Sequence, residues 1–401
     1  MTAPVRHGLP DPAFDAWVAR ARSVRIEDVA AEFRLRLRGR IERVGPCPEC
    51  GGTDRFALNT RKQIFNCRAC GGGDVIRLVQ KVTGCDFLAA CERLAGAAPP
   101  RGQGHMPSPA ALAALEEARA RKRAEAEAKA AQWRERERTR LWGTWSKADA
   151  AAGSPVEAYL GVRGVPLPPG AHLRFAPDHI LWGEPADNGC GRARPVLHRG
   201  PAMLAAIADP DGRFCGLHAT WISLADPDGK ARVLDPETGE LAPAKKTRGS
   251  LNGGRIELVR HRAPRRLVLG EGIETVLSVW AALAAAGEDC SDTAFWTSIS
   301  LANMGGKALA SAPHPTKTVT GRDGVERPWK VPGPDPDPAA AAIPIPETVG
   351  ELFLLGDGDS DRFLTETALV RAARRFARPG LTIRAAFAPD GMDFNTLWRL
   401  S

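Results

Sequence analysis

The pattern of apolar and polar positions divides residues 12–262 into four segments. Residues 12–96 combine short apolar runs with turn residues and predict a small compact unit. Residues 108–150 are rich in Ala, Glu, Arg and Lys, and they predict a long solvated helix with Ser108 as its N-cap. Residues 97–107 are rich in proline and glycine and read as a linker. Residues 151–262 contain short strand-like runs between turns and predict an α+β region.

The C-terminal third, from residue 263 to 401, alternates apolar strands with helices. Strands are expected at 265–270, 293–300, 351–356 and 381–388, and helices run to about residue 286 and over 361–377. This alternation predicts an α/β domain with a parallel sheet. Residues 311–347 interrupt the pattern with many prolines, so they predict a surface insertion or loop without regular structure. The chain is therefore expected to be a multidomain protein that combines α+β and α/β parts.

Composition and charge narrow the classes of protein to consider. The 401 residues carry 55 Lys+Arg against 47 Asp+Glu, a net charge of +8. This excess permits nucleic-acid binding, although Arg-, Ala- and Pro-rich usage is also what a GC-rich genome produces. No apolar run reaches the roughly 18 residues that a transmembrane helix needs. The N-terminus lacks the apolar core of a secretory signal, so a cytoplasmic location is expected.

Two CxxC pairs form the first candidate chemical site. Cys47 and Cys50 are followed after sixteen residues by Cys67 and Cys70, and glycines follow each pair. Zinc takes four thiolates at tetrahedral corners, and two such knuckles joined by a hairpin supply them. A redox CxxC pair would not explain the duplication. Core packing is the expected role of the remaining five cysteines, which have no paired spacing: Cys85, Cys91, Cys190, Cys215 and Cys290.

The hairpin between the two pairs carries basic and aromatic residues together. Arg55 and Lys62 alternate with Phe56 and Phe65. Cations that meet phosphates and rings that stack on bases suit single-stranded nucleic acid. The two phenylalanines equally suit the core of the ribbon itself, and a zinc ribbon can be only a structural staple.

The run CPECGGTDRFALN…FNCRACGGGDVIRLVQ closely resembles the zinc-binding domain of bacterial and phage DNA primases. The resemblance covers about residues 41–96. In that family the ribbon helps to recognise the single-stranded template, which implies a template-binding role for Arg55 and Lys62 here.

Carboxylates follow the predicted strands of the C-terminal third. Glu271 follows the first strand, and Asp357 and Asp359 follow the strand that ends at residue 356. Parallel strands place their carboxyl ends at one edge of the sheet, so these side chains are expected to lie together. Acidic residues that cluster repel one another unless a cation neutralises them, and Mg²⁺ prefers carboxylates, waters and phosphates. A phosphoryl-transfer site with Mg²⁺ or Mn²⁺ is therefore predicted.

This segment resembles a Toprim domain, which bacterial primases share with type IA and type II topoisomerases, OLD-type nucleases and RecR. The resemblance rests on Glu271 and on the DxD of Asp357 and Asp359, and the tail PDGMDFN adds Asp393 as a further acidic candidate. Glu274 and Asp361 are weaker candidates, because acids in the first turn of a helix favour its dipole without any metal. The proline-rich insertion departs from a minimal Toprim domain.

A basic stretch lies just upstream of the acidic site. Lys245, Lys246 and Arg248 fall within a glycine-containing segment that is expected to be a loop. Such a loop suits binding of triphosphates or of the template backbone. It resembles the basic half of the primase catalytic core, and a merely solvated basic loop is the alternative.

The members of the Toprim group differ in features that the chain can be checked for. A type IA topoisomerase needs a nucleophilic tyrosine, and the one tyrosine, Tyr159, lies in a helical context that favours a core role. An OLD-type nuclease or a fused helicase would need a GxxxxGK[ST] loop, which the sequence lacks. RecR, which joins a zinc module to Toprim and binds DNA without catalysis, remains an alternative, as does a Toprim nuclease.

The order of the parts favours a DNA primase of the phage or mobile-element type whose helicase is a separate chain. This resemblance implies primer synthesis on single-stranded DNA from nucleoside triphosphates in DNA replication. Two divalent ions held by Glu271, Asp357 and Asp359, with Asp393 as a further candidate, would support nucleotidyl transfer. The zinc ribbon would present the template.

Overall fold

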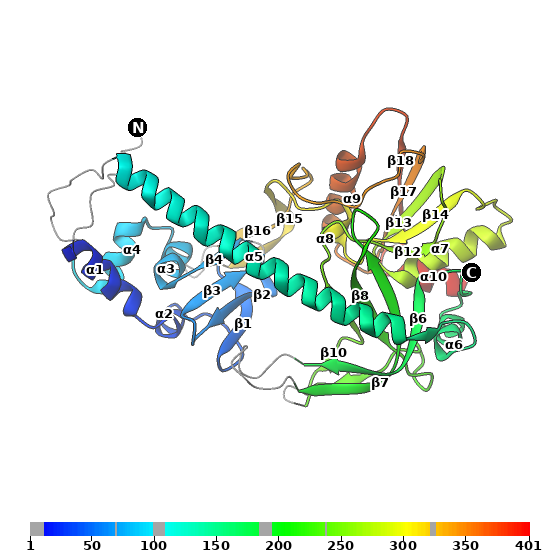
Figure 1. Cartoon of the computed structure of the whole chain (residues 1–401), viewed down its shortest axis with the longest axis horizontal. Helices are drawn as coiled ribbons and strands as arrows, with labels where there is room; N and C mark the ends of the chain where they lie inside the picture. Colours follow the sequence, from blue (N-terminus) through cyan, green and yellow to red (C-terminus); the bar gives the residue numbers. More distant parts are fainter. Residues whose placement is uncertain (1–11, 69, 99–108, 184–194, 237–238, 321–325) are drawn as a thin grey trace. The chain divides into compact units, whose positions relative to one another are not determined.

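The computed structural model describes residues 12–68, 70–98, 109–183, 195–236, 239–320 and 326–401 (Figure 1). The chain forms two compact units. The N-terminal unit comprises Met1–Ala130, Glu184–Pro195 and His314–Lys330, and the C-terminal unit comprises Ala131–Gly183, Val196–Pro313 and Val331–Ser401. The predicted class, a multidomain protein with α+β and α/β parts, is confirmed.

The N-terminal unit is built around a four-stranded antiparallel sheet with the order β1-β2-β3-β4. Its strands are β1 (Glu42–Cys47), β2 (Gly51–Asn59), β3 (Ile64–Cys67) and β4 (Gly71–Gly73). Its short helices are α1 (Pro12–Ser23), α2 (Ile26–Glu32), α3 (Val75–Thr83) and α4 (Phe87–Ala95). Aspartates cap α3 and α4, because Asp74 and Asp86 each accept a hydrogen bond from a first-turn backbone N–H. The core of this unit joins helix and sheet residues such as Trp17, Phe56 and Leu78.

The proline-rich insertion departs from expectation. Instead of lacking regular structure, it forms β15 (Ser311–Thr320) and β16 (Glu326–Pro332), which pair as a two-stranded sheet. Both strands of such a ribbon have a free edge, where a residue without a backbone N–H is tolerated. That is why strands containing Pro313, Pro315 and Pro328 can still pair.

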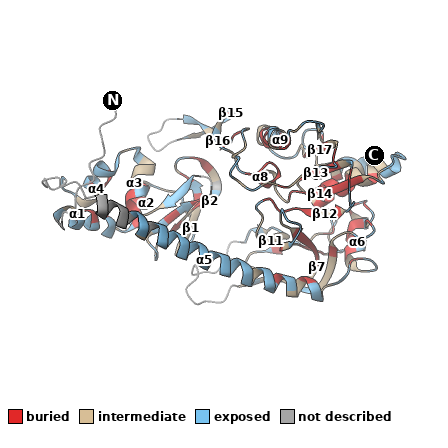
Figure 2. Cartoon of the chain, turned by 45° about the horizontal axis from the view of Figure 1, so that its top comes forward, coloured by how far each residue is buried: buried red, intermediate tan, exposed pale blue. Residues whose placement is uncertain are grey.

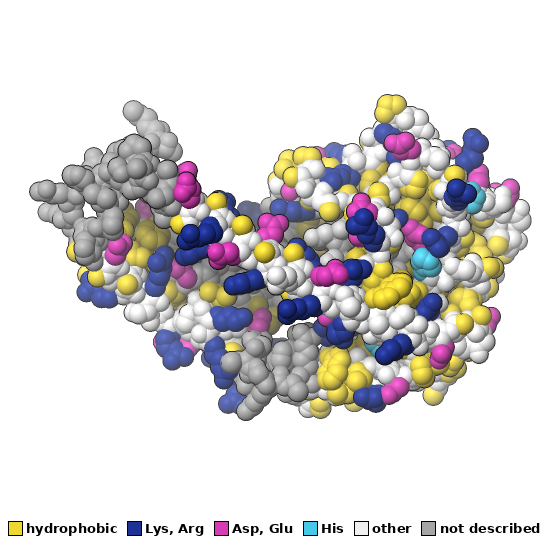
Figure 3. Space-filling model, in the orientation of Figure 1, with side chains coloured by type: hydrophobic (Ala, Val, Ile, Leu, Met, Phe, Trp, Pro, Cys, Tyr) yellow, Lys and Arg dark blue, Asp and Glu magenta, His cyan; other side chains and the backbone are white. Residues whose placement is uncertain are grey.

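The long charged segment is the helix α5 (Pro109–Lys147), as predicted, while Ser108 and the linker residues 99–107 lie outside the described residues. Figure 2 shows that most of α5 is exposed, and Figure 3 shows its basic and acidic side chains interspersed. Among the side chains of α5 that the structure describes, those of Leu141 and Trp145 in its last turns are the buried ones, in a core of the C-terminal unit. No described helix, α5 included, is both long enough and apolar enough to cross a bilayer.

The first sheet of the C-terminal unit has five strands in the order β11-β8-β7-β6-β5, and its described pairings are antiparallel. The strands are β5 (Asp149–Ala150), β6 (Leu173–Trp182), β7 (Val196–Ala208), β8 (Phe214–Trp221) and β11 (Lys245–Gly249). The small antiparallel pair β9 (Val233–Leu234) and β10 (Leu241–Ala242) lies between β8 and β11 in the chain. The helix α6 (Pro155–Val162) contributes Tyr159 and Leu160 to a core that this sheet shares with the second one.

The second sheet of the C-terminal unit has the order β12-β14-β13-β17-β18. It comprises β12 (Ile256–Val259), β13 (Arg266–Gly270), β14 (Thr293–Thr297), β17 (Glu351–Gly356) and β18 (Thr382–Phe387). The last four pair in parallel, which confirms the predicted parallel sheet, and β12 adds an antiparallel edge. The helices that accompany it are α7 (Ile273–Ala285), α8 (Leu301–Met304), α9 (Arg362–Phe376) and α10 (Phe394–Leu400).

Candidate metal centre and candidate active site

The four paired cysteines of the N-terminal unit converge on one point. Cys47 ends β1, Cys67 ends β3, and Cys50 and Cys70 lie in the turns that precede β2 and β4. The four Sγ atoms lie within 4.8 Å of one another. The Cys47–Cys70 and Cys50–Cys67 pairs are each separated by 3.5 Å. The predicted cysteine cluster is therefore formed.

Burial and mutual hydrogen bonds shift the pKa values of three thiols of this cluster, those of Cys47, Cys50 and Cys70. A hydrogen bond with Cys50 lowers the pKa of Cys47 to about 5, and the same interaction raises the pKa of Cys50. Burial raises the pKa of Cys70 to about 12. Four sulfurs at this separation are the donor set that a tetrahedral zinc ion takes, and the ion would supply the missing positive charge.

The hairpin residues of the ribbon separate into core and surface. Phe56 and Phe65 are buried and stack with ring centroids 5.2 Å apart, so they belong to the core of the ribbon and cannot stack on bases. Lys62 is exposed at the turn between β2 and β3. The guanidinium of Arg55 lies 5.8 Å from the ring centroid of Trp329 within the same unit. Only the cations of the predicted nucleic-acid surface are thus accessible.

The cysteines outside the cluster have the packing environments that were expected. Cys91 and Cys215 are buried, and Cys85 and Cys290 are partly buried, each as a free thiol. Cys215 donates a hydrogen bond to the carbonyl of Ser250. Cys190 lies outside the described residues.

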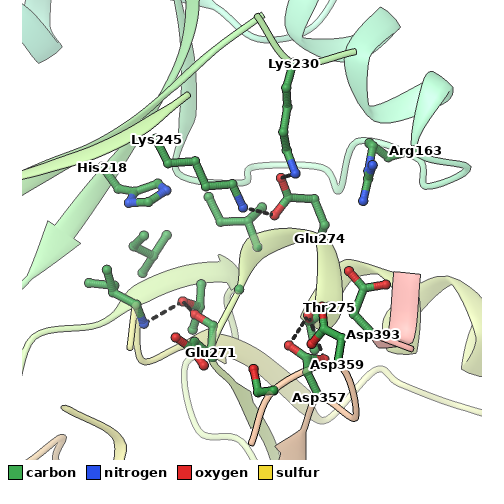
Figure 4. Close-up of a pocket in the computed structure, with 16 residues that line it drawn as sticks. Arg163, His218, Lys230, Lys245, Glu271, Glu274, Thr275, Asp357, Asp359 and Asp393 are labelled. Carbon is green, nitrogen blue, oxygen red and sulfur yellow. Dashed lines mark hydrogen bonds and ion pairs between the residues drawn. The ribbon is translucent and has the colours of Figure 1, made fainter. Parts of the chain in front are cut away.

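A cavity of about 270 Å³ lies in the C-terminal unit, at the carboxyl ends of β13, β14 and β17 (Figure 4). The predicted acidic residues line it together: Glu271, Asp357, Asp359 and Asp393. It is also lined by cationic or titratable side chains of the first sheet and its connections: Arg163, His218, Lys230 and Lys245. One part of the cavity is therefore acidic and the other basic.

Two acidic residues of this cavity are held in an environment that disfavours their charge. Asp357 accepts hydrogen bonds from Thr275 Oγ1 at 3.0 and 3.2 Å and from the backbone N–H of Phe394 at 3.4 Å. Burial nevertheless raises the pKa of Asp357, with the neighbouring charges of Asp393 and Asp359 adding to the effect. Burial and the charge of Asp357 likewise raise the pKa of Glu271. Ionisation of both Asp357 and Glu271 thus calls for an external positive charge.

The chemistry of these donors fits a hard divalent cation. Mg²⁺ and Mn²⁺ bind carboxylate oxygens and retain waters, and a small number of carboxylates suffices for them. In the described part of the chain, the cysteine set is the one group of three or more potential ligands whose atoms all lie within 4.8 Å of one another. The carboxylates line one cavity without closing on one point, which is what mutual repulsion produces.

The basic part of the cavity is organised around Glu274 on α7. Its Oε2 accepts a hydrogen bond from Lys245 Nζ at 2.8 Å, and Lys230 Nζ lies 3.4 Å from its Oε1. The same Oε1 accepts a hydrogen bond from the hydroxyl of Tyr159 at 2.5 Å. Burial alone would raise the pKa of Glu274, but the two lysines outweigh it and hold the pKa well below its usual range. Glu274 is therefore ionised and neutralised within the protein.

Tyr159 is buried and acts as a hydrogen-bond donor. Burial and the charge of Glu274 raise its pKa, so the phenol stays neutral. The expected core role of this residue is therefore confirmed.

The predicted basic loop is in fact the strand β11, and this divides its residues. Lys245 lines the cavity, whereas Lys246 and Arg248 do not. Successive side chains of a strand point to opposite faces, so Lys245 and its neighbours at 246 and 248 are directed to different sides. The earlier interpretation as one cationic loop was wrong for this reason.

The two weaker acidic candidates have different environments. Asp361 caps α9 and accepts a hydrogen bond from the backbone N–H of Leu364 at 3.0 Å. Glu274 instead lines the cavity and pairs with two lysines. The sequence pattern gave no indication of Lys230, His218 or Arg163, because these residues are distant in sequence from the acidic residues of the cavity.

The chain is similar to two groups of known proteins. One is a family of undefined function, and the other is the DNA primases. The family described as "Domain of unknown function (DUF7146)" matches residues 135–258. The chain is 36% identical over 95 residues to a DNA primase of Geobacillus stearothermophilus, which is 23% of this chain and 15% of that protein. It is 38% identical over 77 residues to a DNA primase of Halalkalibacterium halodurans, which is 18% of this chain and 13% of that protein. The matches thus span less than a sixth of these curated relatives.

Among solved structures, the chain is similar to a DNA primase domain from Pseudomonas aeruginosa, with 16% identity and a TM-score of 0.35. That match covers 65% of this chain and 74% of the other. The curated relatives confirm the resemblance to bacterial DNA primases that the sequence motifs indicated.

Proposed function

We propose that this protein is a DNA primase that synthesises short primers on single-stranded DNA from nucleoside triphosphates. The observation that carries the proposal is the cavity at the strand ends, which carboxylates and lysines line together. Carboxylates bind divalent metal ions and lysines bind phosphates. One cavity therefore contains the two kinds of group that nucleotidyl transfer requires. The similarity of part of the chain to DNA primases supports the choice of reaction.

In this proposal the acidic residues hold two divalent ions. Glu271, Asp357 and Asp359 are the proposed ligands, and Asp393 is a further one. When bound, such ions lower the pKa of the attacking 3′-hydroxyl and neutralise the departing pyrophosphate. Thr275 and the backbone N–H of Phe394 orient the carboxylate of Asp357 through their hydrogen bonds. Lys245 is proposed to contact the triphosphate.

The remaining parts of the chain have proposed roles in template binding. Residues 12–96 would form a zinc ribbon domain, followed by a linker and charged helix at 97–150. A basic α+β primase-core region would span 151–262, and residues 263–401 would form the Toprim domain. Arg55 and Lys62 on the ribbon, with Lys246 and Arg248 on β11, would meet the template backbone. A separate replicative helicase is a proposed partner.

The test is incubation of the purified protein with single-stranded DNA, labelled nucleotides and Mg²⁺ or Mn²⁺. Short labelled oligomers that depend on both template and metal are expected. Tight DNA binding without synthesis would replace the proposal with a RecR-like binding module, and nicking without synthesis would replace it with a Toprim nuclease. The Asp357→Asn variant is the matched control, since it must lose the metal-dependent product while it still binds DNA.

A further inference from the structure

The cavity contains a carboxylate that cations of the protein already neutralise. The side chain of Glu274 is 5% exposed, and both of its oxygens already accept from Lys245, Lys230 or Tyr159. A carboxylate bonded to two ammonium groups has little free charge for a divalent ion. Glu274 therefore differs in kind from Glu271 and Asp357, whose pKa values are raised by burial and carboxylate neighbours.

The lysines around Glu274 have long side chains that are partly exposed. The side chain of Lys245 is 36% exposed and that of Lys230 is 21% exposed. A lysine has four flexible methylenes, and an ion pair at both ammonium groups restricts where they can point. Figure 4 shows both lysines directed at Glu274, beside the acidic residues.

A third cation of the same cavity, Arg163, indicates that the cavity binds an anionic ligand. Arg163 lines the cavity and is buried, yet its Nε has no hydrogen-bond partner among the described residues. A buried guanidinium N–H that lacks a partner is costly unless a ligand satisfies it. Phosphate oxygens are the acceptors that arginine and lysine recognise together.

We propose that Glu274 is a positioning residue, which fixes Lys230 and Lys245 beside Arg163 as a subsite for the polyphosphate of the incoming nucleotide. This inference rests on the proposed function and deepens it. The subsite adjoins the proposed metal ligands, so a triphosphate held there would present its reacting phosphorus to the acidic part of the cavity. Tyr159 supports the arrangement by holding Oε1 of Glu274 in place.

The binding of anion and of metal can be measured separately. Inorganic tripolyphosphate, without divalent ions, is titrated into the protein by calorimetry, and Mn²⁺ is titrated in a second experiment. Lys230→Met and Lys245→Met are each expected to weaken tripolyphosphate binding about 10- to 100-fold, as for a lost hydrogen bond to a charged group. Neither should alter Mn²⁺ binding. Wild-type tripolyphosphate affinity in both variants would overturn the subsite.

Glu274→Gln distinguishes a positioning residue from a metal ligand. Mn²⁺ affinity should be unchanged, and tripolyphosphate should bind as tightly as before or more tightly, because a negative charge has gone. Primer synthesis should nevertheless fall about tenfold or more in kcat, with a smaller change in KM, because the lysines are no longer oriented. Loss of Mn²⁺ binding would identify Glu274 as a ligand and refute the inference, as would wild-type kcat.

Glu257→Gln is the matched control, because Glu257 also joins two cations, Arg255 and Arg260, but does not line the cavity. It should leave both titrations unchanged. If Glu274→Gln fails to fold, a triple variant replaces it: Lys230→Met, Lys245→Met and Glu274→Leu. This variant removes all three charges, so no buried charge is left without its partner. It must keep Mn²⁺ binding and lose tripolyphosphate, and any other pattern refutes the subsite. If the wild type makes no primers, the proposed function fails, while the titrations of the two lysine variants still decide whether the polyphosphate subsite exists.

Discussion

Replacing Asp357 by asparagine tests whether this residue is needed for binding a cation or for the stability of the fold. Asparagine keeps the shape of the side chain and an oxygen that can accept from Thr275, whose hydroxyl lies 3.0 Å from Oδ2. It removes a charge that burial and the carboxylates of Asp393 and Asp359 already disfavour. The metal-free variant should therefore be as stable as the wild type or more stable at neutral pH.

The loss of metal binding can be estimated from the charge alone. Two unit charges 4 Å apart interact by about 4 kcal/mol at an effective dielectric constant of 20. Each 1.4 kcal/mol is a tenfold change in Kd, so Asp357→Asn should weaken Mn²⁺ binding by at least about 100-fold. In the wild type, Mn²⁺ at about 100 times its Kd should add about 2.7 kcal/mol of stability, which the variant should lack.

The assay is thermal unfolding of both proteins with and without Mn²⁺, followed across pH. For a domain of 150 to 250 residues, roughly 2–4 °C in Tm corresponds to each kcal/mol, so Mn²⁺ should raise the wild-type Tm by several degrees. Because burial and like charges raise the pKa values of Asp357 and Glu271, the metal-free wild type should lose stability as the pH rises through them. This loss should be smaller in the variant.

The control for this experiment is Asp361→Asn, because Asp361 caps α9 from outside the cavity and asparagine is an equally good cap. It should respond to Mn²⁺ as the wild type does. If Asp357→Asn retains the full Mn²⁺-induced rise in Tm, the carboxylate is not a ligand and the proposed metal site is wrong.

Three further predictions concern the ribbon and the charge. Cys67→Ala should abolish zinc binding and unfold residues 41–75 while the C-terminal unit stays folded, which metal analysis and hydrogen exchange would measure; full zinc content would contradict it. Phe56→Ala should destabilise the N-terminal unit by about 3–5 kcal/mol in denaturant unfolding, because it is fully buried against Phe65; a change below 1 kcal/mol would contradict the packing. Binding to single-stranded DNA should weaken steeply with salt, by a slope of about 0.7 per phosphate contact, and the Lys245→Ala/Lys246→Ala double variant should flatten it; a flat wild-type response would make the net charge a solubility feature.

Local spacing predicted the parts of the structure that depend on neighbours in sequence. The two CxxC pairs predicted the cysteine cluster because each pair brings two sulfurs from one turn. Glu271 and Asp357 were placed together because parallel strands share an edge, and the alternation of strands with helices is visible in the sequence. A general rule of sheet topology was thus sufficient to predict that these two residues lie near each other.

The contacts that sequence reasoning missed have no local signal. Lys230 meets Glu274 across 44 positions, and neither residue stands at a spacing that marks a motif. The segment around Lys245 contains glycines and was expected to be a loop, yet pairing with β8 makes it a strand. Prolines suppressed the prediction of β15 and β16, because only the two-stranded pairing reveals that each strand has a free edge.

The two parts of the cavity impose opposite electrostatic requirements. Around Glu274, the protein supplies two ammonium groups for one carboxylate, so this part carries a net positive charge and accepts an anion without any further ion. Around Asp357, burial and carboxylate neighbours raise the pKa of this residue, so its ionisation calls for an added cation. In the proposed site, a metal-bound polyphosphate would satisfy both parts at once, because its metal ions would meet the carboxylates and its phosphates would meet the lysines. A metal ion or a free polyphosphate alone would satisfy only one part. Each of the two should therefore bind more tightly when the other is already bound than it does alone.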